Sequence, residues 1–173
     1  MAEAETAPGE VWAEVWPDGR FCVRGQVFRA VIGVGGLRRD KSEGDGATPI
    51  AHLPLRRVLY RADRVKKPQA IVAVEALAPA DGWCDDAGHA DYNCYVRLPH
   101  AARHEALWRD DGVYDVIGVL GWNDAPVVRG RGSAIFLHVV RPDMAPTEGC
   151  VALALADVQA VLAMGLRGII VRG

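Results

Sequence analysis

Cys150 and His138 are the residues of this chain whose types and spacing favour covalent chemistry. A cysteine attacks as its thiolate, and a free thiol with a pKa of ~8.5 is only a few per cent ionised near neutrality, so it needs a nearby base. His138 lies in the β-branched, apolar run Ile135–Val140, which predicts a strand, and Cys150 follows Gly149 on the next loop. A strand and a returning loop can bring imidazole and thiol together. The amides of Gly149 and Cys150 could then face the oxyanion of a tetrahedral intermediate.

The spacing of these two residues also allows a purely structural interpretation. A single buried cysteine is usually a small core hydrophobe, and a histidine on an apolar strand is usually a core residue with its ring nitrogens hydrogen-bonded. On spacing alone this interpretation is the commoner one. The catalytic interpretation therefore depends on support from other segments.

Three separated segments form a pattern in a fixed order. Lys41–Pro49 has the sequence Lys-Ser-Glu-Gly-Asp-Gly-Ala-Thr-Pro, Asp81–Asp86 is followed by Tyr92-Asn93, and His138 precedes Thr147-Glu148-Gly149-Cys150-Val151. The pattern resembles the L,D-transpeptidase catalytic domain, the YkuD-type domain of bacterial cell-wall enzymes. In that family a histidine precedes a Ser/Thr-x-Gly-Cys segment and the upstream loop reads Lys-x-Glu-Gly-Asp-Gly-x-Thr-Pro. The resemblance covers most of the chain, from about residue 31 to residue 171.

The resemblance implies a peptidoglycan L,D-transpeptidase. Cys150 would attack a carbonyl of a stem peptide and form a thioester, while His138, oriented by the carbonyl oxygen of Val139, acts as base and then as acid. An amine of a neighbouring stem would take the acyl group, giving a 3→3 or a 1→3 cross-link. Thr147 would support the loop and donate to the substrate. The implied setting is the bacterial periplasm or cell envelope, in cell-wall biogenesis and cell shape.

Further implications concern ligands and alternatives. Stem peptides are the expected partners, carbapenems the expected covalent inhibitors, and no metal or organic cofactor is needed. Family members commonly carry an arginine two residues after the cysteine, where this chain has Ala152, and a glycine where it has Ala51. Two alternatives stay open. One is a thiol hydrolase, acting as an L,D-carboxypeptidase or amidase on the same stems. The other, which these departures favour, is a catalytically inactive wall-binding module.

Large aromatic and amide side chains in predicted loops are candidates for substrate binding. An aromatic ring in a loop is less easily explained as core, and an asparagine there can hydrogen-bond a peptide backbone or simply form a turn. The candidates are Trp83, Tyr92, Asn93, Trp122 and Asn123.

Composition limits the remaining functional classes. The chain has 173 residues, half of them hydrophobic, and a formal net charge of -2, which gives no electrostatic case for nucleic-acid binding. No segment reaches the ~20 apolar residues that cross a bilayer. Residues 1–10 are small, acidic and proline-bearing, without the basic start and apolar middle of a secretory signal, and we expect them to be a disordered tail. Residues 11–173 are expected to form a single catalytic domain and a monomer.

Short strands and frequent glycine and proline turns predict a mainly β domain, and the resemblance implies a β-sandwich or open barrel with one or two short helices packed beside it. A hairpin is expected around Pro17–Gly19, and Pro54 places its strand at a sheet edge. The other expected strands are 26–33, a well-buried strand at 70–76, 113–120, 135–140 and 166–171. A long loop is expected at 81–95, and helices at 101–108 and 151–164.

The spacing of cysteines and histidines bears on whether the chain forms a disulfide or a metal site. Cys84 and Cys94 are close enough in sequence for a disulfide across a loop, although separation alone does not decide it. Together with His89, His100 and His104 they show none of the paired spacings that place two ligands on one zinc ion. No metal site is therefore expected.

Overall fold

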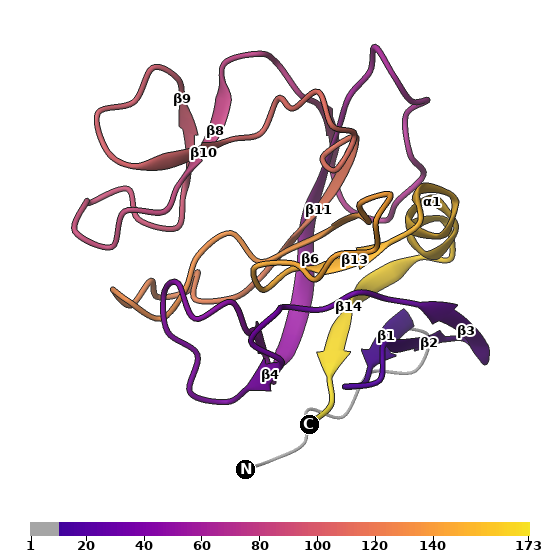
Figure 1. Cartoon of the computed structure of the whole chain (residues 1–173). Coiled ribbons are helices and arrows are strands. Elements are labelled where there is room, and N and C mark those ends of the chain that lie inside the picture. The colour runs from indigo at the N-terminus through magenta and orange to yellow at the C-terminus, as the bar shows by residue number, and fades with distance from the viewer. Residues whose placement is uncertain (1–10) are drawn as a thin grey trace.

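The computed structural model describes residues 11–173, so the predicted tail at residues 1–10 lies outside the described residues. The fold is mainly β, as predicted, with one helix in the described chain (Figure 1). The elements in chain order are β1 (Val11–Val15), β2 (Arg20–Val23), β3 (Gln26–Arg29), β4 (Leu37–Arg38), β5 (Thr48–Pro49), β6 (His52–Tyr60), β7 (Val74–Ala76), β8 (Asp81–Cys84), β9 (Tyr95–Arg97), β10 (His104–Ala106), β11 (Val116–Leu120), β12 (Phe136–Val139), β13 (Val151–Leu153), α1 (Leu155–Ala163) and β14 (Leu166–Val171).

The main sheet runs β13-β12-β11-β6-β14-β1-β2-β3, with β7 added beside β6. Its two ends meet, because Val31, just beyond β3, forms an isolated bridge with Ala152 of β13. The N–H of each of these two residues donates to the carbonyl oxygen of the other, at 2.8 and 2.9 Å. The sheet is therefore a nearly closed barrel, in agreement with the open barrel implied by the resemblance.

Alternation of side chains explains how the strands cover the core. In β1 the side chains of Val11, Ala13 and Val15 are buried while the intervening ones are partly exposed, as expected for a strand with one inward face. The predicted hairpin is present: β1 and β2 pair antiparallel around a turn in which Gly19 has a positive φ of 84°. A positive φ is easily adopted only by glycine, so this position fixes the turn.

The helix packs its apolar face on the same core. Val158, Val161 and Leu162 are fully buried and belong to the main hydrophobic cluster. Asp157 lies in the first turn, where a negative charge is favoured by the helix dipole. Gly165, with φ 87°, ends the helix and leads directly into β14, the predicted final strand.

Several expected elements are different in the structure. The strand that contains Pro54, β6, was predicted at a sheet edge but is central, between β11 and β14. A proline is tolerated there because the pairing of β6 is interrupted at this residue. The ladder with β14 stops at Pro54, and the register with β11 shifts next to it. The segment 70–76 forms only the short β7, which is half-buried to exposed. The predicted helix at 151–164 begins with a strand, β13, and becomes helical only at Leu155.

The segment predicted as a long loop and a second helix instead forms a small antiparallel sheet. Its strand order is β10-β8-β9, with β8 in the centre (Figure 1). Glu105 of β10 lies opposite Trp83 of β8. The predicted helix at 101–108 is absent because residues 104–106 pair with β8, about twenty residues earlier in the chain. Local propensity does not predict pairing with a distant strand. This small sheet supplies one wall of the site described next.

Candidate active site

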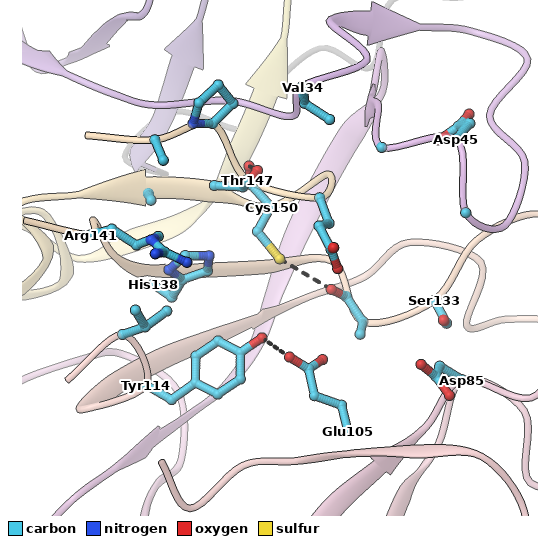
Figure 2. A pocket seen from close by; sticks show the side chains of 18 of the residues that line it. Val34, Asp45, Asp85, Glu105, Tyr114, Ser133, His138, Arg141, Thr147 and Cys150 are labelled. Carbon is cyan, nitrogen blue, oxygen red and sulfur yellow. Dashed lines mark hydrogen bonds between the residues drawn. The ribbon is translucent and has the colours of Figure 1, made fainter. Parts of the chain in front are cut away.

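Strand register brings His138 and Cys150 to one face of the sheet. β12 and β13 are parallel, and His138 lies opposite Ala152. Because alternate residues of a strand point to the same face, Cys150, two residues before Ala152, projects on the His138 side. Both side chains line one pocket of about 570 Å³, and Figure 2 shows them projecting into it.

The His138 imidazole is fixed in one orientation. Its Nδ1 lies 2.9 Å from the carbonyl oxygen of Val139, the contact that the resemblance leads one to expect. An imidazole that donates through Nδ1 to a backbone carbonyl keeps Nε2 as its proton acceptor. The edge of the Tyr114 ring supports the imidazole, with ring centroids 5.4 Å apart and planes at 78°. Burial lowers the pKa of His138 from 6.5 to about 4, so the ring is neutral at pH 7.

The Cys150 thiol is held between two backbone groups. Its S–H donates to the carbonyl oxygen of Ala134 at 3.2 Å, and the N–H of Phe136 donates to Sγ at 3.3 Å. Burial raises the pKa of the thiol to about 12, and the negative charge of Glu105 acts in the same direction. The resting pair is therefore a neutral thiol beside a neutral imidazole, so the proton must leave the sulfur as the sulfur attacks.

The loop in front of the cysteine is fixed by Thr147 and Gly149. The Thr147 hydroxyl donates to the carbonyl oxygen of Cys150 at 2.6 Å and accepts the N–H of Gly149 at 3.2 Å. Gly149 has φ 134°, and a Cβ there would lie 2.8 Å from the carbonyl oxygen of Ala47. The Gly149 N–H, expected as an oxyanion donor, is thus engaged by Thr147. The Cys150 N–H has no acceptor within residues 11–173 and remains available to an oxyanion.

The Lys41–Pro49 segment packs directly on this loop. Gly33 forms a bridge with Thr147, and its N–H donates to Oγ1 of Thr48 at 2.9 Å. Within the segment, Lys41 and Asp45 form a buried ion pair at 2.7 Å. Both segments therefore hydrogen-bond to the chain at Gly33–Gly36, which holds them side by side although about a hundred residues separate them in the sequence.

The segment that carries Tyr92 and Asn93 joins the other two from behind. The Tyr92 hydroxyl donates to Glu43, and it accepts the N–H of Gly132 at 3.0 Å. The Ser133 hydroxyl donates to the same Glu43 oxygen at 2.8 Å. Ser133 is next to Ala134, whose carbonyl oxygen accepts the hydrogen bond of the Cys150 thiol, so this network positions the backbone that holds the sulfur.

Asn93 is buried, and both polar atoms of its side chain are hydrogen-bonded within the protein. Its Oδ1 accepts the Nε1–H of Trp83 and the N–H of Ala134, each at 3.0 Å, and its Nδ2 donates to the carbonyl oxygens of Trp122 and Asn123, each at 2.9 Å. None of the five residues suggested for substrate binding, Trp83, Tyr92, Asn93, Trp122 and Asn123, lines the pocket. Their polar side-chain atoms hold the frame behind it.

Comparison with known families agrees with this geometry. The family model of the L,D-transpeptidase catalytic domain, YkuD, matches residues 12–171. The chain belongs to this family. No curated protein and no solved structure gave a significant match.

Several residues that line the YkuD pocket were not predicted from the sequence. Glu105 and Tyr114 face the thiol from the wall opposite the Gly149 loop, and the Tyr114 hydroxyl donates to the Glu105 carboxylate (Figure 2). Arg109 lies over the Tyr114 ring at 5.2 Å, and Arg141 reaches the pocket from the turn after β12. Glu105 lies on β10, Arg109 and Tyr114 lie on the connection from β10 to β11, and Arg141 follows β12, so only the tertiary fold brings them to the pocket.

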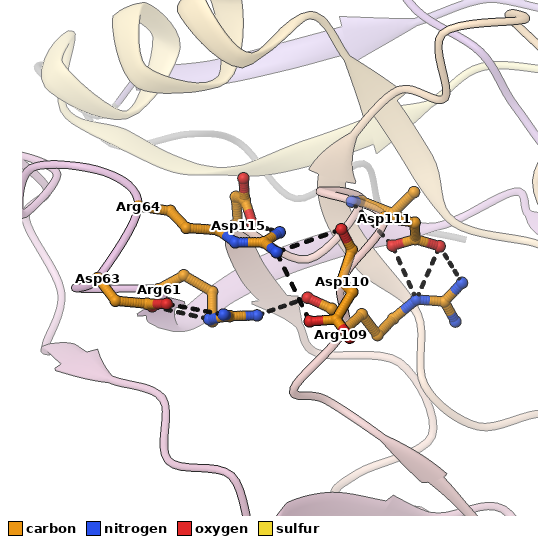
Figure 3. Close-up of polar contacts among 8 residues, drawn as sticks. Arg61, Asp63, Arg64, Arg109, Asp110, Asp111 and Asp115 are labelled. Carbon is orange, nitrogen blue, oxygen red and sulfur yellow. Dashed lines mark hydrogen bonds and ion pairs between the residues drawn. The ribbon is translucent and has the colours of Figure 1, made fainter.

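A buried arginine holds the segment that carries this wall (Figure 3). Arg61, 3% exposed, stacks on the Trp108 ring at 3.6 Å and donates to the carbonyl oxygen of Arg109. Arg109 in turn pairs with Asp111, whose carboxylate accepts the N–H of Val113 at 3.2 Å. Arginine is suited to this position because its planar guanidinium can stack and donate in several directions at once. The network fixes the chain that leads into Tyr114.

Ala152 marks the departure from the common YkuD pattern. It is 1% exposed, lies opposite His138, and its backbone closes the barrel through Val31. The cationic groups that line the pocket instead are Lys41, Arg109 and Arg141. Positive charge therefore reaches this YkuD site from loops rather than from the strand after the cysteine.

Within the described chain, His89, Asp91 and His100 bring ligand-type atoms within 4.8 Å of one another, which their spacing did not indicate. Hydrogen bonds account for the cluster. His100 Nε2 lies 2.9 Å from Asp91, and Nδ1 of each histidine accepts a backbone N–H, at 3.1 Å for His89 and 3.3 Å for His100. A metal-bound imidazole normally donates the N–H of its other ring nitrogen to an acceptor. In both histidines Nδ1 instead faces a donor, which does not suit a metal ligand. Neither is there a disulfide: Cys84 and Cys94 are free.

Proposed function

We propose that the protein is a cysteine L,D-transpeptidase of peptidoglycan, acting at the cell envelope. The observation that carries the proposal is the single pocket shared by a buried thiol and an imidazole whose Nδ1 is bonded to Val139. In the described part of the chain, no helix is long and apolar enough to cross a bilayer. Membership of the YkuD family supports the acyl-transfer chemistry.

The first half-reaction makes a thioester. Nε2 of His138 takes the proton of Cys150 as the sulfur attacks a stem-peptide carbonyl, which forms the C–S bond and a tetrahedral oxyanion. The Cys150 N–H is the available backbone donor for this oxyanion, and one such donor is worth ~10²–10³ in rate. The imidazolium then gives its proton to the departing amine. Because the thiol and the imidazole are both neutral at rest, the charged imidazolium and oxyanion form only while the substrate is bound.

The second half-reaction returns the thiol. An amine of a neighbouring stem attacks the thioester carbonyl, its proton passes to His138, and the C–S bond breaks as the imidazolium reprotonates the sulfur. Attack by water in place of the amine would make the protein an L,D-carboxypeptidase or amidase. Product mass separates the two reactions, because one gives cross-linked dimers and the other gives trimmed monomers.

Intact-mass spectrometry of a thioester adduct tests the nucleophile. Wild-type protein incubated with a tetrapeptide stem or a carbapenem should gain one acyl mass, and Cys150→Ser should gain none. Cys94→Ser is the matched control, since Cys94 is a free, exposed thiol outside the pocket, and it should be acylated like the wild type. An adduct that persists in Cys150→Ser would refute the proposal. A folded wild type that binds sacculi without any adduct would favour a wall-binding module instead.

A further inference from the structure

Glu105 is a carboxylate in the pocket that neither thioester formation nor the family pattern uses. It projects from β10 into the cavity that holds Cys150, and its side chain is 28% exposed there (Figure 2). Its Oε1 accepts the Tyr114 hydroxyl and lies 3.9 Å from Arg109. All of these contacts are made by Oε1, and Oε2 has no hydrogen-bond partner among residues 11–173. One oxygen is thus fixed by the protein, and the other faces the cavity.

The negative charge of Glu105 opposes the first half-reaction. It is, after burial, the next contribution that raises the pKa of the Cys150 thiol, so it disfavours the thiolate. A cation entering the cavity would reverse this effect. The attacking group of the second half-reaction is such a cation, because an amine with an ordinary pKa near that of lysine, ~10.4, is almost entirely ammonium at neutral pH.

We propose that Glu105 binds the ammonium group of the acyl acceptor and takes its first proton, so that Glu105 selects an amine over water at the thioester. The proposal rests on the proposed function and assigns the acceptor side of the same site. Tyr114 is the positioning residue, since its hydroxyl holds Oε1 and leaves Oε2 for the acceptor.

The protons balance through two groups. An acceptor ammonium carries three N–H protons, of which one remains on the amide product. Glu105 removes one and releases it to solvent after the reaction. The other passes from the tetrahedral intermediate to His138 and then to the leaving sulfur. Glu105 and His138 therefore act on different protons of the same nitrogen, and burial of Glu105, which raises the pKa of its carboxyl, makes it a better proton acceptor than an exposed glutamate.

Glu105→Gln tests the assignment, because an amide oxygen can still accept the Tyr114 hydroxyl while the charge and the basicity are lost. The experiment measures thioester formation with a donor tetrapeptide, and then the ratio of amide product to hydrolysed product with a diaminopimelate-containing acceptor. We expect acylation no slower than in the wild type, because the opposing charge is gone, and a product ratio lower by ~10²-fold, the lower range of general acid–base effects. Glu75→Gln is the matched control, since Glu75 is exposed on β7 outside the pocket, and its ratio should not change.

Two further measurements separate proton removal from a structural effect. With hydroxylamine, a nucleophile that is already unprotonated at neutral pH, Glu105→Gln should match the wild type. With the ammonium acceptor, aminolysis in Glu105→Gln should rise about tenfold per pH unit between pH 7 and 9, as free amine accumulates. Glu105→Asp, which keeps the charge, should recover part of the ratio.

An equal loss with both nucleophiles, a parallel loss of acylation, or an unchanged product ratio would each overturn the role of Glu105 while leaving Cys150 as the nucleophile. A folded wild-type protein that forms no thioester with any donor would refute the proposed function, and with it this inference. The outcomes are therefore distinguishable by the step at which the reaction stops.

Discussion

Replacing His138 with asparagine should remove an acid-sensitive contribution to folding stability. The imidazole is 6% exposed, and burial lowers its pKa from 6.5 to about 4. Between these two pH values the unfolded chain binds a proton at His138 and the folded protein does not, so stability falls as the pH falls. One pH unit between folded and unfolded pKa corresponds to about 1.4 kcal/mol, which gives a loss of about 3 kcal/mol on acidification from pH 7 to pH 4.

Urea unfolding of wild-type protein and His138→Asn at intervals of pH measures this contribution. The asparagine amide can still donate to the carbonyl oxygen of Val139, so the variant loses the titration and keeps the contact. The variants share all other titrating groups, among them Glu105, whose raised pKa makes an opposite contribution in acid, so the difference between the two curves isolates His138. The difference in unfolding free energy should change by about 3 kcal/mol across the window. Parallel curves would refute the buried, neutral imidazole.

The remaining predictions concern the cysteine loop. The pKa of Cys150 is raised to about 12 from 9.0, so the folded protein keeps a proton that the unfolded chain loses, and stability should fall above pH 9 in the wild type and much less in Cys150→Ala, as measured by urea unfolding. Gly149→Ala should lower the unfolding free energy by about 1–3 kcal/mol and slow acylation, because alanine at φ 134° brings Cβ within 2.8 Å of a carbonyl oxygen. Wild-type rates in Gly149→Ala would contradict the rigid loop.

The sequence predicted correctly those elements that depend on residues close to one another in the chain. The hairpin around Gly19 needs only a turn residue and two flanking strands, and the final strand after Gly165 needs only a helix stop. Pro54 was misleading, because proline excludes only the pairing that its missing N–H would have made, and β6 interrupts its ladders at that place. The β10 strand could not be predicted, since it depends on pairing with β8 rather than on its own residues.

The candidate site shows the same division. Cys150, His138 and the Thr147 loop follow from a motif in which each residue type has a chemical reason. The loop aromatics and asparagines were expected to face substrate, yet both polar side-chain atoms of Asn93 are hydrogen-bonded within the protein. The sequence does not distinguish a buried asparagine that hydrogen-bonds backbone groups from an asparagine that binds substrate. Glu105 had none, because its place in the pocket depends on the small sheet.

The three sequence segments are coupled by one carboxylate. Glu43, from the Lys41–Pro49 segment, accepts hydrogen bonds from Tyr92 of the second segment and from Ser133, next to the backbone oxygen that holds the Cys150 thiol. We therefore expect a change in any of these three side chains to alter the position of the sulfur, although none of them lies at the reacting atoms. The pattern that identifies the family is thus a set of contacts that positions a neutral thiol and imidazole. The Glu105 carboxylate, to which we assign the acyl acceptor, lies on the wall opposite these contacts.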